Sequence, residues 1–195
     1  MMTRALWIGL LATFGSLGLA LLAGFAGAVN AVPMPLLAAR VWGGVTVLLA
    51  IYLGMPSRRR WIIALEPAWI TAGHAWRFAL GVYVLALVQN GELPGGFALT
   101  GGIAEAIVGA SAPLAGFWLG AGTRRRRTLL TLWHVLSLAA LLHMMGVGIA
   151  LHLSGDRLID SMARFPLFLL PLFAIPLTLA AHLLTLFAMA FPGNR

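Results

Sequence analysis

The sequence predicts an all-α membrane protein, a polytopic bundle of six transmembrane helices with both ends of the chain in the cytoplasm. Hydrophobic residues make up 61% of the chain and charged residues only 9%, proportions far from those of soluble domains. The basic residues behind the net charge of +8 gather in two clusters between apolar runs. Because a crossing takes about 20 apolar residues, the 195 residues form about six crossings and a single domain, 1–195.

The first two spans are expected at about 5–28 and 36–56. The first apolar run is longer than the core of a secretory signal, which predicts a retained helix. Arg58, Arg59 and Arg60 then form a short cytoplasmic loop. The following "WIIALEPAW" is expected along the membrane interface, because its tryptophans suit the headgroup zone and Glu66-Pro67 disfavours an uninterrupted helix.

The second half of the chain is punctuated by three polar segments. "NGELPGG" predicts an external turn, the run Arg124–Arg127 a second cytoplasmic loop, and "SGDRLIDSMAR" a polar outer loop. The four spans that these segments separate are expected at about 69–90, 97–120, 128–153 and 165–191.

The positions of the basic residues predict the topology and the location. With the amino terminus inside and six crossings, both arginine clusters, Arg4 and Arg195 lie on the cytoplasmic side. The expected location is therefore the bacterial cytoplasmic (inner) membrane, with lipid as the main partner. The gathering of seven of the thirteen basic residues in two short loops also argues against nucleic-acid binding. The chain has no cysteine, which excludes disulfides, thiolate metal sites and covalent haem attachment.

Small residues and prolines predict how the helices pack. Span four carries a four-residue repeat and a G-x-x-x-G pair, formed by Gly102, Ala106 and Ala110 and by Gly116 and Gly120, so we expect it at the centre of the bundle. Prolines at five-residue intervals predict a bent or locally irregular sixth span, whether as a packing kink or as a transport hinge; these are Pro166, Pro171 and Pro176.

Two opposite charges are expected to meet inside the membrane. Arg77 and Glu105 each lie eight residues into spans that enter from opposite sides, which places both about 12 Å deep in a core about 30 Å thick. The predicted Arg77–Glu105 ion pair could lock two helices together, or it could form a proton or ligand site. His143 is expected at a similar depth, completing a polar triad.

The histidines of the fifth span do not form one cluster by themselves. His134 and His143 are nine residues apart, which is a half-turn offset, and His152 reaches the outer interface. His74 and His182 on other spans share the depth of His134, so these three could ligate haem b or, with Met144 or Met145, copper or zinc. Structural hydrogen bonding, proton transfer and quinone contact remain open for them. Trp133, like Trp7, Trp42 and Trp61, is expected to anchor a helix end at the interface.

Two stretches carry a resemblance: "GELPGGFALTGGIAEAIVGASAPLAG" and "RFPLFLLPLFAIPLTLAAHLLTL". Both resemble segments of small multi-pass bacterial inner-membrane proteins of uncharacterised function. The resemblance implies a helical bundle and an acidic residue near "GGIAE", which Glu105 provides here. It implies no activity.

Three classes of function follow, and enzymes are the less favoured group because nucleotide-binding, hydrolase-elbow and zinc-protease motifs do not occur. The favoured class is a membrane protein that binds or conducts a small ligand or a proton, as in transport, at Arg77, Glu105 and His143. The first alternative is a haem- or quinone-linked redox subunit using His74, His134 and His182. The second is a scaffold subunit in a homo-oligomer or larger membrane complex.

Overall fold

The computed structural model describes Gly18, Gly43 and residues 67–119, 123–164 and 166–190, and the described residues contain helices and no strands. Apart from Gly18 and Gly43, the spans predicted at about 5–28 and 36–56 lie outside this part of the chain. The described α-helices are α4 (Pro67–Gly73), α5 (Trp76–Gln89), α6 (Ala104–Leu114), α7 (Arg124–Leu153) and α8 (Ile175–Ala190). The π-helical turns η1 (Ala98–Ile103) and η2 (Ala115–Leu119) flank α6, η4 (Leu170–Ala174) precedes α8, and η3 (Arg157–Ala163) is a 3₁₀ helix.

Four helical segments of the described residues are long and apolar enough to cross a membrane, namely Pro67–Gln89, Ala98–Leu119, Arg124–Leu153 and Leu170–Ala190. They coincide with the last four predicted spans. Two boundaries differ by more than two residues. The sixth span begins at Leu170 instead of at about 165, and the arginines expected in a loop form the first turn of α7. Arginine is a good helix former, and the Thr123 hydroxyl accepts a hydrogen bond from the Arg126 backbone N–H at the start of the helix.

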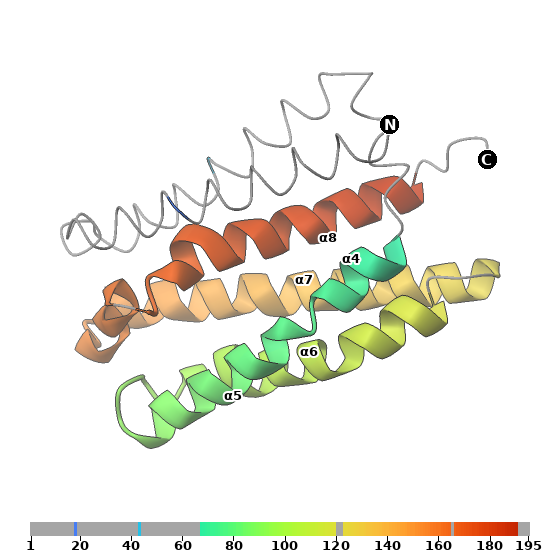
Figure 1. Ribbon diagram of the computed structural model, residues 1–195. Helices are drawn as coiled ribbons and strands as arrows, with labels where there is room; N and C mark the ends of the chain where they lie inside the picture. Colours follow the sequence, from blue (N-terminus) through green and yellow to red (C-terminus); the bar gives the residue numbers. More distant parts are fainter. Residues whose placement is uncertain (1–17, 19–42, 44–66, 120–122, 165, 191–195) are drawn as a thin grey trace.

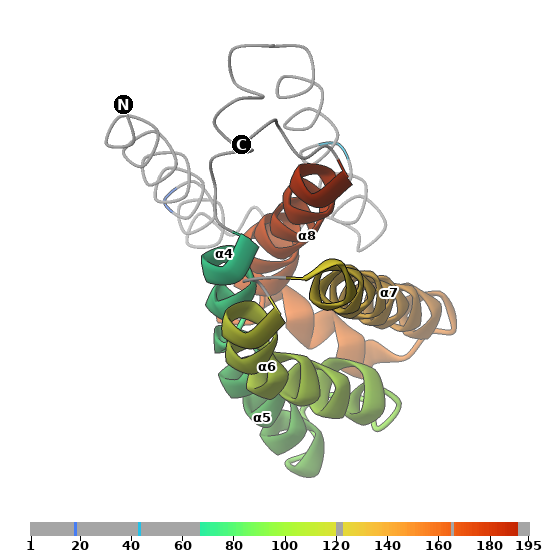
Figure 2. The same cartoon turned by 90° about the vertical axis from the view of Figure 1, so that its right-hand side faces the viewer.

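These segments run antiparallel in a four-membered bundle (Figure 1). The broken rod of α4 and α5 lies against α6, α7 lies beside α8, and contacts between α6 and α7 and between α4 and α8 close the ring (Figure 2). We call the end where α4 and α7 begin the arginine end, and the opposite end the loop end. At the arginine end, the Arg127 guanidinium donates to the Met189 carbonyl, where a cation also suits the carboxyl end of α8.

The buried residues of α7 follow a heptad-like pattern. They alternate steps of four and three residues: Leu130, His134, Ser137, Leu141, Met144 and Gly148. The inward face of α8 has similar spacing at Thr178, His182, Thr185 and Met189. Such spacing keeps one stripe of each helix turned toward its neighbours in a left-handed bundle. Each stripe includes one histidine, so the same pattern that builds the core carries an imidazole into it.

Glycines let α6 approach the α4–α5 rod at backbone distance. Gly102, Gly109 and Gly116 recur every seven residues. A Cβ on Gly109 would overlap the Phe78 backbone, one on Gly116 the backbone of Ala68, and one on Gly102 would lie 2.5 Å from Leu85. Of the predicted four-residue repeat, Gly102 and Ala106 lie at this contact, where a Cβ on Gly81 would overlap their backbones, whereas Ala110 is exposed. The seven-residue stripe matches the heptad pattern of the other helices.

Prolines disturb the helices where they occur. Pro113 lies inside α6 and the π-helical η2 follows it directly, while Pro171 lies in η4. A proline cannot donate to the preceding turn, and a π-helical turn is one way in which a helix accommodates that loss. The prediction of an irregular sixth span is confirmed at η4.

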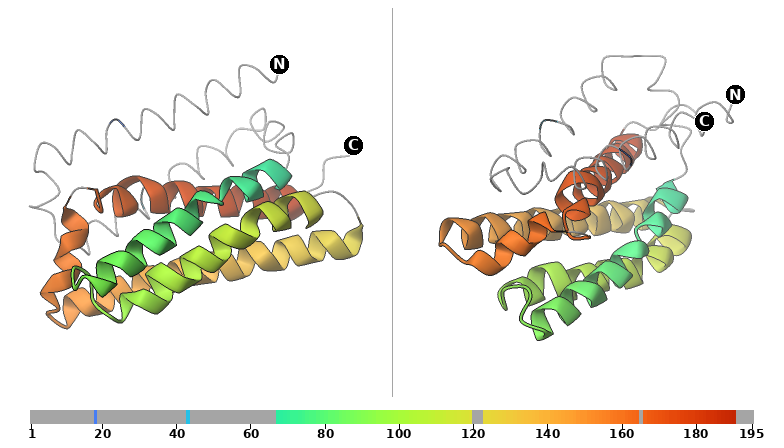
Figure 3. Two further views of the ribbon diagram at one scale, coloured as in Figure 1. Left: turned by 60° about the horizontal axis from the view of Figure 1, so that its bottom comes forward. Right: turned by 60° about the vertical axis from the view of Figure 1, so that its left-hand side comes forward.

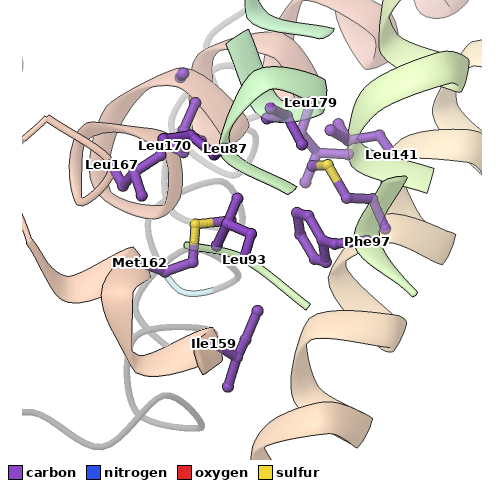
Figure 4. Close-up of a cluster of buried hydrophobic side chains, with 12 residues drawn as sticks. Leu87, Leu93, Phe97, Leu141, Ile159, Met162, Leu167, Leu170 and Leu179 are labelled. Carbon is purple, nitrogen blue, oxygen red and sulfur yellow. The ribbon is translucent and has the colours of Figure 1, made fainter. Parts of the chain in front are cut away.

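Two apolar clusters lie toward opposite ends of the bundle. The larger cluster, toward the loop end, joins α5, η3, η4 and their neighbours through residues such as Leu93, Phe97, Ile159 and Met162 (Figure 4). The smaller one, toward the arginine end, contains Ala115, Leu130 and Met189. The buried polar residues described below lie between them along each helix.

Candidate functional site: a buried polar centre

The break between α4 and α5 sets the orientation of three polar residues. Around His74 the backbone bonds follow the three-residue pattern of a 3₁₀ turn, with His74 N–H to the Thr71 carbonyl and Arg77 N–H to the His74 carbonyl, both at 3.0 Å. In such a turn, residues three apart project on the same side. Thr71, His74 and Arg77 therefore share one face, and all three are buried. Figure 3 shows the offset between the two helices.

Arg77 and Glu105 form the ion pair that the sequence predicts. The guanidinium Nε donates to Glu105 Oε2 and Nη2 donates to Oε1, each at 2.6 Å. The two side chains are 0% and 1% exposed. A bidentate geometry of this kind is the strongest form of charge-assisted hydrogen bond, and it joins α5 to α6 in the interior of the bundle.

A hydrogen-bonded chain continues from Arg77 through two histidines. Nη1 of Arg77 lies 3.0 Å from His182 Nε2, and His182 Nδ1 lies 2.8 Å from His134 Nδ1. His134 Nε2 in turn lies 2.9 Å from the Thr71 hydroxyl, which donates to the Pro67 carbonyl at 2.6 Å. The chain therefore links α5, α8, α7 and α4.

Arginine fixes the direction of this chain, because a guanidinium can only donate. Nε2 of His182 must accept from Arg77, so a neutral His182 carries its proton on Nδ1 and donates it to His134. His134 then carries its proton on Nε2 and donates to Thr71. Every bond consequently points the same way, from the ion pair toward Pro67.

His74 completes a group of three imidazoles from three different helical segments. One ring nitrogen from each of His74, His134 and His182 can be chosen so that all lie within 4.8 Å of one another, and all three residues are buried. The His74 ring stacks on His182 with centroids 4.3 Å apart and planes 14° apart. Nε2 of His74 is buried and has no hydrogen-bond partner among the described residues. We call Thr71, His74, Arg77, Glu105, His134 and His182 the polar centre.

Sequence reasoning predicted two separate sites, and the structure joins them. The contact between Arg77 and His182 connects the ion pair to the histidine group. The expected place of His143 beside Arg77 is wrong, because His143 is exposed on α7. Its depth suits the pair, but it lies nine residues and so half a turn from the buried His134.

The arrangement of the three imidazoles does not fit a haem, but it fits a single small metal ion. Axial ligation would require two imidazoles to face each other across a porphyrin, whereas His74 and His182 are stacked ring on ring at 4.3 Å. Three nitrogens within 4.8 Å match the scale of a single ion. Met144 belongs to the large apolar cluster, ten residues along α7 from His134, and Met145 follows it. Neither thioether lies in the histidine layer.

Two members of the site were missed from the sequence. Thr71 is fully buried and accepts from His134, a role that its three-residue spacing from His74 and Arg77 could have indicated. Trp133, expected at the interface, instead packs beside all three histidines, with ring centroids 5.0 to 5.9 Å away. Its indole N–H donates to the Ser111 hydroxyl at 3.0 Å, which satisfies its polar group inside the bundle.

Comparison with known proteins gives a family and no activity. Neither a curated protein nor a solved structure is significantly similar to the chain. A family profile described as a domain of unknown function, DUF8737, matches residues 34–190, which include every residue of the polar centre. The chain belongs to the DUF8737 family.

Proposed function

We propose that the chain is a six-span protein of the bacterial cytoplasmic membrane, with one domain and both termini in the cytoplasm. The four described apolar segments support this placement, as do the arginines at one end of the bundle. We call η1, α6 and η2 together the α6 rod. Lipid would cover its large exposed apolar side chains, which include Leu99, Ile107, Leu114, Phe117 and Trp118. Burying charges inside a lipid-covered bundle costs free energy, so the buried charges of Arg77 and Glu105 suggest a function.

Within this protein we propose that three hydrogen-bonded residues of the polar centre, His182, His134 and Thr71, transfer protons toward the arginine end of the bundle, and that His74 takes no part in this transfer. The observation that carries the proposal is the continuous, one-directional chain of hydrogen bonds from Arg77 through His182 and His134 to Thr71. Neutral imidazole can accept a proton on one nitrogen and release another from its second nitrogen, so two bonded histidines can pass a proton without moving far. The residues differ from the predicted ligand or proton site by having His182 and His134 in place of His143.

The transfer steps can be followed atom by atom. A proton that arrives on Nε2 of His182 would displace the Nδ1 proton to Nδ1 of His134, and the Nε2 proton of His134 would pass to the Thr71 hydroxyl as that hydroxyl releases its own proton to water at the arginine end. Arg77 acts as the gate, because its Nη1 occupies His182 Nε2 until the guanidinium moves away. Glu105 would keep Arg77 neutralised during this movement through its two bonds.

Thr71 offers a mild test of the chain. Replacing Thr71 by Val removes the hydroxyl that accepts from His134 while keeping the shape of the side chain. We expect potential-driven proton flux into vesicles containing the purified protein and a pH-sensitive dye, and we expect Thr71→Val to lower it to the level of protein-free vesicles. Thr185→Val is the matched control, since Thr185 is also buried and bonds only the backbone of its own helix in the contacts described.

Two results would overturn the proposal: unaltered protein that passes no protons, or Thr71→Val protein that passes them as fast as Thr185→Val protein.

Absence of proton flux in the unaltered protein would favour the alternative that the chain is a scaffold subunit, which the ion pair supports. The Arg77–Glu105 pair joins α5 to α6 directly and can hold the bundle together without moving any ligand. In that case the exposed apolar face of the α6 rod would pack on further copies or on a larger membrane complex.

A further inference from the structure

The unpartnered nitrogen of His74 is the feature that the hydrogen-bonded chain leaves unexplained. His74 is only 3% exposed, and its Nε2 makes no hydrogen bond to any residue that the structure describes. A buried polar atom without a partner costs free energy, because it has lost its hydrogen bonds to water. An apolar ring would pack against His182 and Trp133 without that cost. The position of His74 beside two further buried imidazoles therefore points to a ligand.

We propose that His74, His134 and His182 bind one monovalent copper ion. Imidazole is a good ligand for copper, and three nitrogens within 4.8 Å, each from a different helical segment, supply a three-coordinate site. Thr71 already accepts from Nε2 of His134, which is the outer contact that orients a metal-binding histidine and leaves its Nδ1 toward the group. Copper(I) binding by these three histidines does not depend on whether the hydrogen-bonded chain passes protons.

The charge of the surroundings selects the monovalent ion. Arg77 and Glu105 neutralise each other, so the polar centre with neutral histidines has no net charge before a metal enters. A metal then adds its whole charge to a buried, apolar layer, where the cost of an uncompensated charge rises steeply with its size. Copper(I) adds one unit, whereas zinc(II) adds two and has no free carboxylate in the centre to offset the second.

Copper and the hydrogen-bonded chain would be alternative occupants of the same nitrogens. A neutral imidazole has one lone pair; that of His134 accepts from His182, and that of His182 accepts from Arg77. Coordination replaces both bonds, while Arg77 keeps its two bonds to Glu105. The His74 ring must also turn out of its stack on His182 to aim a lone pair at the ion, a rotation about a broad side-chain torsion.

Anaerobic titration of the purified full-length protein with copper(I), in competition with a chromophoric chelator, tests the site. We expect one ion per chain and a loss of affinity of more than about 100-fold in His74→Phe, because losing a ligand outweighs the 10–100-fold effect of losing an outer contact. Phenylalanine keeps a ring against His182 and leaves the chain from Arg77 to Thr71 intact. His143→Phe, at an exposed histidine of α7, is the control and should bind copper as the unaltered protein does.

Copper K-edge X-ray absorption of the loaded, unaltered protein provides a test that needs no variant. The expected spectrum has three nitrogen ligands and no sulfur. Sulfur ligation would assign the copper to methionines and overturn the proposal, as would zinc(II) binding as tight as copper(I) or undiminished copper binding by His74→Phe. Proton flux in His74→Phe should remain normal, so failure of the copper site and failure of the proton chain give different results.

Discussion

At the scale of single residues, Arg77 holds the polar centre together, because its three nitrogens bond Glu105 and His182 on two neighbouring helices. Arg77→Leu would leave the Glu105 carboxylate buried without a counter-charge. We expect a loss of about 3–5 kcal/mol in unfolding free energy, the cost of removing one partner of a buried pair. Reversible unfolding in mixed detergent would measure it.

The double variant Arg77→Leu/Glu105→Leu provides the control, since replacing both partners by apolar residues removes the stranded charge. It should recover most of the stability lost in Arg77→Leu. Equal stability of the single variant and the unaltered protein would show that the pair is not needed to hold α5 against α6.

Two quantities place a side chain in the polar centre: its depth along the helix and the direction in which it faces around the helix axis. Depth can be counted from a helix start, and the count correctly paired Arg77 with Glu105 and grouped His74, His134 and His182. The direction in which a side chain faces can be predicted only if the local helix type is known as well. The three-residue spacing of Thr71, His74 and Arg77 hints at a shared face, but the 3₁₀ turn that aligns them has no signature in hydropathy, so the link from Arg77 to His182 could not be predicted.

At the scale of helices, the glycines of α6 determine how closely it approaches α5, and this distance brings Glu105 to Arg77. A Cβ on Gly109 would overlap the Phe78 backbone and press the helices apart. We expect Gly109→Ala to cost about 1–3 kcal/mol, the usual effect of overpacking, and to weaken the ion pair. Gly146→Ala is the matched control, because a Cβ there would meet no atom of the described residues within 4 Å.

The control should change stability in the opposite direction. Alanine in a helix interior is favoured over glycine by about 0.5–1 kcal/mol, so Gly146→Ala should unfold at a higher detergent concentration than the unaltered protein. A Gly109→Ala protein as stable as Gly146→Ala would disprove the close approach of α5 and α6. The sequence indicated a small-residue face on this helix, but not its seven-residue period, because several glycines and alanines offer competing spacings.

At the scale of the whole molecule, the bundle is layered along its length. A small apolar cluster closes the arginine end, the polar centre follows, and the large apolar cluster fills the loop end. Hydropathy predicted the spans because length and apolar content decide which segments can cross a bilayer. It could not predict the layers, since those depend on which buried side chains meet across helices. The layers place the hydrogen-bonded chain from Arg77 to Thr71 nearer the arginine end than the loop end, so the direction of the proposed proton transfer depends on the orientation of the bundle in the membrane.

The orientation can be tested with introduced cysteines, because the natural chain has none. Arg157 at the loop end and Arg124 at the arginine end are both exposed. With the arginine end in the cytoplasm, a membrane-impermeant maleimide applied to intact cells should label Arg157→Cys at once and Arg124→Cys only after permeabilisation. A third variant, Thr3→Cys, should behave as Arg124→Cys does, since four crossings would separate two positions on the same side. Labelling of Thr3→Cys in intact cells would require an odd number of crossings before α7 and rule out the six-span arrangement. Labelling of Arg124→Cys in intact cells would show that the bundle has the opposite orientation. The Thr71 end of the hydrogen-bonded chain would then face the outside.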